Sequence, residues 1–126
     1  MSRPAVTLFV WGLYDYVVAA TLLFAPGLFG LLGMPTNDLE WIRIMAGLAA
    51  VIGTIFVHAA RTENTPFFHA SVRIRMVVGA YFAALVVVTG APVVILAFAA
   101  AEFTGAAWTG FALRGLRPAA GVAVGR

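Results

Sequence analysis

The chain of 126 residues contains no cysteine and no lysine, and only 10% of its residues are charged. Without cysteine it can have no disulfide framework, no thiolate metal site and no cysteine nucleophile. A soluble domain usually carries about 25% charged residues, so the shortage of charge argues against a soluble fold. The sequence also lacks the Walker, Gly-x-Ser-x-Gly and His-Glu-x-x-His motifs of common nucleotide-binding and hydrolytic sites.

The sequence is instead rich in long apolar stretches: 63% of its residues are hydrophobic and the mean hydropathy is +1.00. A transmembrane helix needs about 20 such residues, and four stretches qualify, at 5–24, 39–60, 72–89 and 92–113. The first is too long for the apolar region of a signal peptide and no cleavage site follows it, so we expect it to be retained. We therefore predict a single membrane domain, an all-α integral membrane antiparallel four-helix bundle, with a mobile tail at 114–126.

The eight arginines predict the orientation of this bundle. In a four-span arrangement most of them fall on one side of the membrane, in three groups: Arg3; Arg61, Arg73 and Arg75; and Arg114, Arg117 and Arg126. By the positive-inside rule, both termini and the central loop are then cytoplasmic (N-in/C-in). No basic run or recognition motif suggests a nucleic-acid partner. Under this interpretation Arg75 lies at the entrance of the third span.

The second span has two different faces when it is drawn as a helix with a step of roughly 100° per residue. The small and polar residues on one side are Glu40, Arg43, Gly47, Ala50, Thr54, His58 and Arg61, and the bulky residues opposite are Met45, Leu48, Ile52, Ile55 and Phe56. We expect the polar side to pack against other helices and the bulky side to face lipid. Asn37, followed three residues later by Glu40, predicts a capping box at the start of this helix.

Two carboxyl groups fall near the middle of the predicted membrane. Asp15 lies about 15 Å into the first span at 1.5 Å per residue, and Glu102 lies near the middle of the fourth. Acids at this depth are costly and often mark proton relays or ligand sites. Small residues share a face with Glu102 and predict close helix contact there: Ala91, Ala99, Gly105, Ala106 and Thr109.

Asp15 and Glu102 are the candidate catalytic residues, acting as general acid and base. In the alternative interpretation they are structural, one pairing with Arg43 or bonding to a tyrosine or threonine hydroxyl. The side chains predicted to line a ligand site with them are Trp11, Tyr14, Arg43, Tyr81 and His58. Arg43 could reach inward to the acids or outward to lipid head groups. His58 and His69 lie at different depths, so we expect neither a metal site nor a haem, and no other cofactor is indicated.

The second span carries a pattern known from other membrane proteins. The run E-W-I-R-I-M-A-G-L-A-A-V-I-G, from Glu40 to Gly53, with A-A-R at 59–61, resembles small four-helix bacterial inner-membrane families of the DoxX-like type. This resemblance implies a bacterial inner (plasma) membrane location, and such families include membrane subunits linked to quinone-dependent oxidoreductases. The chain is also similar in size to small multidrug exporters, which carry an acid in their first helix, although Glu102 and the long apolar loop after the first span depart from them.

Three functional hypotheses follow. In the first, the protein binds a lipophilic small molecule, such as a quinone, an isoprenoid or a lipid, in an intramembrane cavity lined by Asp15, Arg43 and Glu102, with acid/base catalysis as a variant. In the second, it is a small proton-coupled exporter that works as a homodimer through Asp15. In the third, it is a structural accessory subunit of a larger membrane complex.

Overall fold

The computed structural model describes residues 1–116 and is all-helical over that range. Four of its helices are long and apolar enough to cross a membrane, as predicted for a multi-pass four-helix bundle. The helices are α1 (Arg3–Phe24), α2 (Gly27–Leu31), α3 (Leu39–Arg61), α4 (Thr65–Thr89) and α5 (Ile95–Arg114). Most of the tail predicted to be mobile, 117–126, lies outside the described residues.

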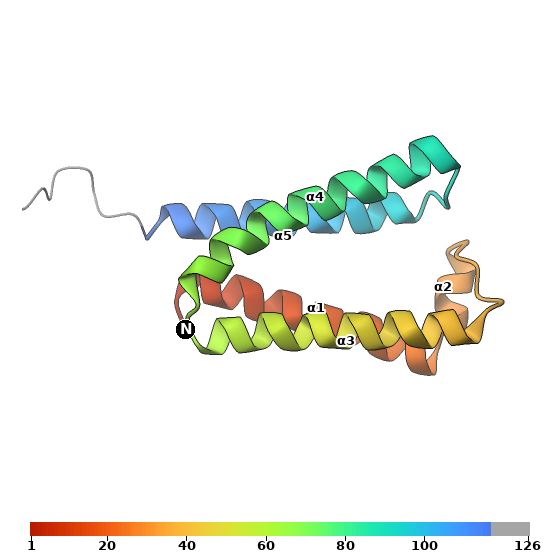
Figure 1. The fold of residues 1–126 in the computed structure, drawn as a ribbon, viewed down its shortest axis with the longest axis horizontal. Helices are drawn as coiled ribbons and strands as arrows, with labels where there is room; N and C mark the ends of the chain where they lie inside the picture. The colour runs from red at the N-terminus through yellow and green to blue at the C-terminus, as the bar shows by residue number, and fades with distance from the viewer. Residues whose placement is uncertain (117–126) are drawn as a thin grey trace, which may run out of the picture.

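The four long helices form two antiparallel pairs (Figure 1). α1 packs along α3, α4 packs along α5, and the two pairs meet chiefly through α1 and α5. Figure 1 shows the pairs close together where α1 begins and diverging toward the other end, which carries α2. A buried apolar cluster lies at the close end and draws on all four long helices: Ala5, Leu8, Phe56, Ala59, Ala60, Phe68 and Leu113. We call this close end the basic end, because Arg3, Arg61, Arg73 and Arg114 lie toward it.

Side-chain caps fix where the helices begin. The Ser2 hydroxyl accepts a hydrogen bond from the Ala5 backbone, and the Asn64 side chain accepts one from the Phe67 backbone. At α3 the cap is Asp38, whose carboxylate accepts from the backbone N–H groups of the next residues. The predicted capping box of Asn37 and Glu40 is therefore wrong, because Asp38 is the cap residue with extended backbone. The Glu40 carboxylate instead pairs with Arg43.

The start of α4 differs from the prediction in a way that changes the site. We predicted a span beginning near Val72, whereas the helix begins at Thr65. Asn64 caps this earlier start, and Pro66 sits in the first turn, where its missing N–H group costs nothing. Arg75 is consequently about 15 Å into the helix at 1.5 Å per residue, and its predicted place at the helix entrance is wrong.

The face of α3 that packs on α1 is not the polar face. Its buried residues are Ile42, Ala46, Gly53, Phe56, Ala59 and Ala60, whereas the polar residues from Glu40 to Arg61 are mostly exposed. The expected inward turn of the polar face is therefore wrong. The reason is steric: a Cβ atom on Gly53 would lie 2.8 Å from the Gly12 carbonyl oxygen, so the two backbones touch where α1 and α3 cross. Small residues, and not polar ones, permit this approach.

Polar groups on the outer face of α3 find partners within α3, and one of them also contacts α1. Arg43 pairs with Glu40 one turn earlier, at 2.9 Å. The Thr54 hydroxyl donates to the Ala50 carbonyl at 2.8 Å and also lies 2.7 Å from the Tyr16 hydroxyl of α1. Because Arg43 and Thr54 each have a partner within α3, polarity does not require this face to be buried.

The short helix α2 bridges the two pairs at the end where they diverge. Its Phe29 ring stacks on Phe98 of α5, with ring centroids 6.0 Å apart. The apolar loop that the sequence places after the first span therefore contacts the opposite helical pair.

At the basic end, Glu63 ties the α3–α4 turn to the start of α1. Its carboxylate accepts hydrogen bonds from the Ser2 hydroxyl at 2.6 Å and the Ser2 backbone N–H at 2.7 Å. These bonds hold the pKa of Glu63 below its ordinary value of 4.5, and the bond from the Ser2 hydroxyl has the larger effect. Folding that lowers a carboxyl pKa adds stability at pH values above the ordinary pKa, and this contribution is lost as the pH falls through the folded-state pKa.

We expect Glu63→Gln to raise amide exchange in the first turn of α1 several-fold at pH 7, because the neutral amide accepts the Ser2 bonds less strongly. The difference from the unmodified protein should vanish in acid, where the native carboxyl is neutral as well. Hydrogen exchange read by mass spectrometry in detergent measures this. Glu40→Gln, which removes an exposed acid far from Ser2, is the control, and equal effects of the two changes would contradict the assignment.

Candidate functional site

A buried ion pair joins α4 to α5 midway along the bundle. The Arg75 Nε atom donates to the Glu102 Oε2 atom at 3.0 Å, and the two side chains are 4% and 20% exposed. Counted from the helix ends at the basic end, both residues lie about 15–18 Å into the bundle. Charges this deep are stable only when they are paired, so this contact determines how α4 and α5 face each other.

The guanidinium group of Arg75 also contacts aromatic rings of the opposite helical pair. Its central carbon lies 4.0 Å from the ring centroid of Trp11 on α1 and 5.6 Å from that of Phe56 on α3. Cation–π attraction is strongest for tryptophan and increases when water is excluded. Gly105 of α5 makes the arrangement possible, because a Cβ atom there would collide with both the Arg75 guanidinium and the Trp11 ring. Arg75 thus connects both helical pairs.

Two hydrogen-bond donors in this cluster are buried without an acceptor among residues 1–116. They are the indole N–H of Trp11 (Nε1) and the Nη1 group of Arg75. An unsatisfied buried donor costs about 1–3 kcal/mol, and more when it is charged. The two side chains that carry these unpaired donors contact each other, since the Arg75 guanidinium lies 4.0 Å from the Trp11 ring centroid.

Asp15 and Tyr14 lie beside these donors. The Tyr14 ring packs edge-on against Trp11, with centroids 4.9 Å apart. Asp15 is partly buried, and its Cβ atom faces Gly53 of α3. Glu102 and Arg75 are close enough for their charges to act on it. Within residues 1–116 the Asp15 carboxyl forms no hydrogen bond or ion pair, so it can exchange a proton without breaking a native contact.

The structure brings together some of the residues singled out from the sequence and separates others. Asp15, Glu102, Trp11 and Tyr14 belong to the cluster around Arg75. His58 is exposed near the end of α3, and Tyr81 is 60% exposed on α4, so neither lies in this cluster. Among residues 1–116, no three His, Cys, Asp or Glu side chains come together as a metal site.

The expectation that Arg43 faces the two acids is wrong. Its side chain is 60% exposed and pairs with Glu40 on the same helix. Arg43 lies only four residues after the first residue of α3, where its long side chain can remain near the helix end. The partner of Glu102 is Arg75, which was missed because the start of α4 was predicted too late. Asn64 with Pro66, a cap followed by a proline, was the sequence signal that could have revealed it.

The chain matches no protein-family model, and neither a curated protein nor a solved structure is significantly similar to it.

Proposed function

We propose that this protein binds a lipophilic small molecule that carries a hydrogen-bond acceptor, with a quinone carbonyl as the best-fitting chemistry. The acceptor oxygen would sit against the Trp11 indole N–H and the Arg75 Nη1 group. The pair of unsatisfied buried donors is the observation that carries this proposal. An isoprenoid hydrocarbon would leave both donors unpaired, so among the candidate ligands we favour a molecule with a polar head.

In this proposal the two acids have different roles. Glu102 holds the Arg75 guanidinium in place through its 3.0 Å contact, so it positions a binding group and is poorly suited to exchange protons. Asp15 has no such bond and lies beside the cluster. Asp15 is then the group that exchanges protons with a bound carbonyl compound. This division replaces the symmetric acid and base pair expected from the sequence.

We further propose a bacterial inner-membrane location with the basic end cytoplasmic. Arg3, Arg61, Arg73 and Arg114 lie toward that end, which is the distribution that the positive-inside rule requires. The DoxX-like sequence pattern in α3 supports the same location. A quinone-type ligand would be abundant in that membrane and could enter from lipid.

The direct test is mass spectrometry of small molecules that co-purify with the protein in mild detergent, followed by binding of a short-chain quinone. Trp11→Phe removes the N–H donor and leaves a smaller aromatic ring beside Arg75, with a weaker cation–π contact. We expect it to weaken quinone binding about 5- to 10-fold, the value of one hydrogen bond of about 1–1.4 kcal/mol.

Two controls make this test specific. Trp108→Phe changes an exposed tryptophan on α5 and should leave the quinone affinity unchanged. A hydrocarbon with the same tail and no carbonyl should bind the unmodified protein and Trp11→Phe equally. The proposal is refuted if no lipophilic molecule co-purifies and the quinone binds the two tryptophan variants with equal affinity.

A further inference from the structure

One face of α3 stays largely exposed in the part of the chain that the structure describes. We call the residues on it the α3 seam: Glu40, Arg43, Gly47, Ala50, Thr54, His58 and Arg61. All of them are exposed except Ala50, which is half-buried. Phe56 marks the side of α3 that faces α4, because its ring contacts that of Phe67. At a helical step of roughly 100° per residue the seam is centred about 160° from Phe56, so it points away from the α4–α5 pair.

The α3 seam has the spacing of a surface that packs along another helix. Its residues follow one another at intervals of three or four, and the distance from Glu40 to Arg61 is three heptads. A repeat of about 3.5 residues keeps one stripe of a helix against a partner helix over its whole length, in a left-handed pair. Local hydrogen bonds satisfy Arg43 and Thr54, so it is this spacing, and not unmet polarity, that indicates a partner.

Gly47 is an independent indication of a helix from outside the chain. Four glycines inside the long helices lie so close to another helix that an added Cβ atom would come within 3.0 Å of it: Gly12, Gly53, Gly79 and Gly105. An added Cβ atom on Gly47 would meet nothing within 4 Å. Glycine inside a helix weakens that helix relative to alanine, and among the described residues no neighbour accounts for it at Gly47. The close approach of a second helix to the seam would account for it.

The charges of the α3 seam favour a second copy of the chain as the partner. Glu40 and Arg43 pair with each other at 2.9 Å and are 80% and 60% exposed, so an acid and a base share this surface one turn apart. Copies of one membrane protein insert with the same orientation, so two seams related by a two-fold axis run parallel. Each Arg43 could then contact the Glu40 of the other copy as well as its own. Arg61 ends α3, and its long side chain can extend into water there.

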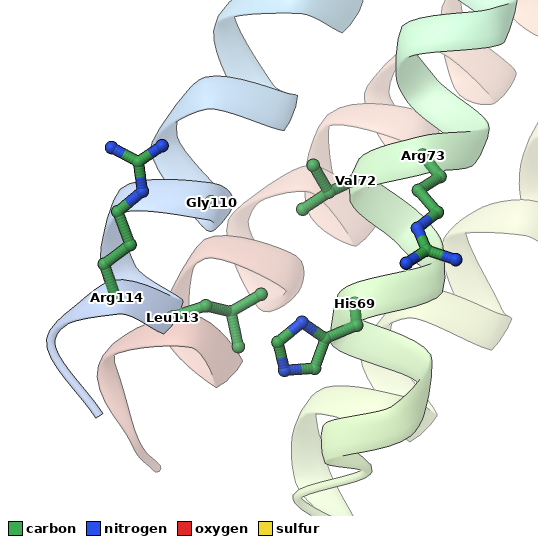
Figure 2. A pocket seen from close by; sticks show the side chains of 6 residues that line it. All are labelled: His69, Val72, Arg73, Gly110, Leu113 and Arg114. Carbon is green, nitrogen blue, oxygen red and sulfur yellow. The ribbon is translucent and has the colours of Figure 1, made fainter. Parts of the chain in front are cut away.

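The α4–α5 pair presents a different surface at the basic end. A hollow of about 170 Å³ lies between its two helices. Figure 2 shows Arg73 and Arg114 on opposite outer sides of this hollow, and none of the residues that line it is acidic. A second copy that docked on this surface would bring arginines together without a carboxylate, and like charges oppose association.

We propose that the chain forms a two-fold symmetric homodimer in the membrane through the α3 seam. Gly47 and Ala50 allow the two α3 helices to approach closely. Thr54, whose hydroxyl lies 2.7 Å from that of Tyr16, continues the contact toward the basic end and brings α1 to its rim. The seam shares no residue with the cluster around Arg75, so this proposal does not rest on the proposed function.

Disulfide mapping is the direct test, because the chain has no cysteine of its own. The single variants Ala50→Cys and Thr54→Cys of the full chain are oxidised in the membranes in which they are expressed. A disulfide requires the two Cα atoms to lie within about 7 Å, so we expect both variants to give a product of twice the chain mass. Leu48→Cys and Ile55→Cys are the controls, at positions 52% and 48% exposed on the bulky side of α3, and should give almost none of this product.

Gly47→Leu tests the close approach of the two helices separately. The single chain has room for the added side chain, because nothing lies within 4 Å of the Cβ position. In the dimer the same side chain would overfill the contact and should weaken association about 10-fold. The measurement is energy transfer between donor-labelled and acceptor-labelled chains as they are diluted with increasing lipid. Ile52→Phe, which adds bulk at an exposed position on the other side of α3, should leave the association unchanged.

Three results would overturn the proposed dimer. The first is equal cross-linking, or none, on the two sides of α3. The second is an association of Gly47→Leu as strong as that of Ile52→Phe. The third is a cross-linked product of Ala50→Cys with a mass other than twice that of the chain, which would show that the α3 seam binds a different protein.

Discussion

Glu102→Gln is expected to destabilise the protein by about 3–5 kcal/mol, the usual cost of breaking a buried ion pair from one side. The change leaves the Arg75 guanidinium charged, with a side chain only 4% exposed. Arginine cannot lose its proton in a protein, so the positive charge has no means of neutralising itself. Arg75→Gln should cost less, because the remaining Glu102 carboxylate is 20% exposed and therefore less deeply buried than the arginine.

Combining the two changes should recover part of the loss, because two neutral amides leave no buried charge and can bond to each other. The measurement is unfolding in detergent for the two single variants and the double variant, read as a double-mutant cycle. Glu40→Gln and Arg43→Gln form the matched control, since that exposed pair should contribute no more than about 1 kcal/mol. Additive losses at Arg75 and Glu102 would contradict the proposed pairing.

Gly105→Ala is expected to cost about 1–3 kcal/mol although it adds only one methyl group. That methyl would occupy space held by the Arg75 guanidinium and the Trp11 ring. The arginine cannot swing away without leaving Glu102, and the indole is confined between α1 and α5. We therefore expect the two helical pairs to separate slightly, with a loss of the 4.0 Å cation–π contact.

Gly110→Ala on the same helix is the control for this effect. Its added methyl has room, since the nearest atom is 3.9 Å away, and alanine favours a helix over glycine by up to about 1 kcal/mol. Thermal unfolding in the same detergent should therefore show opposite signs for the two substitutions. If both substitutions changed the stability by the same amount and in the same direction, the close approach of Trp11 and Arg75 to α5 would not depend on a glycine at position 105.

The fold was largely predictable because transmembrane helices follow from apolar length alone. Four spans, their antiparallel order and the burial of Gly105, Ala106 and Thr109 all agree with the structure. The helix start at Thr65 was harder to predict, because its first residues include polar groups that also suit a loop. That single boundary determined whether Arg75 was assigned to a charged helix end or to the interior.

The site could be predicted only in part, because sequence periodicity gives the faces of a helix and not the neighbour that each face meets. Asp15, Glu102, Trp11 and Tyr14 were found because charge and aromatic rings stand out in an apolar span. Arg43 was misplaced because the polar face of α3 was expected to be the face that packs against the other helices. In α3 the close contact at Gly53 decides the packing face, and local bonds satisfy Arg43 and Thr54.

The position of the ion pair within one helical pair has a consequence for biogenesis. Membrane helices insert first and associate afterwards, and α4 and α5 are consecutive and joined by a short turn. The Arg75–Glu102 pair can therefore form within the α4–α5 hairpin before the α1–α3 pair docks. When α1 docks, Trp11 then meets a guanidinium whose counter-ion is already in place.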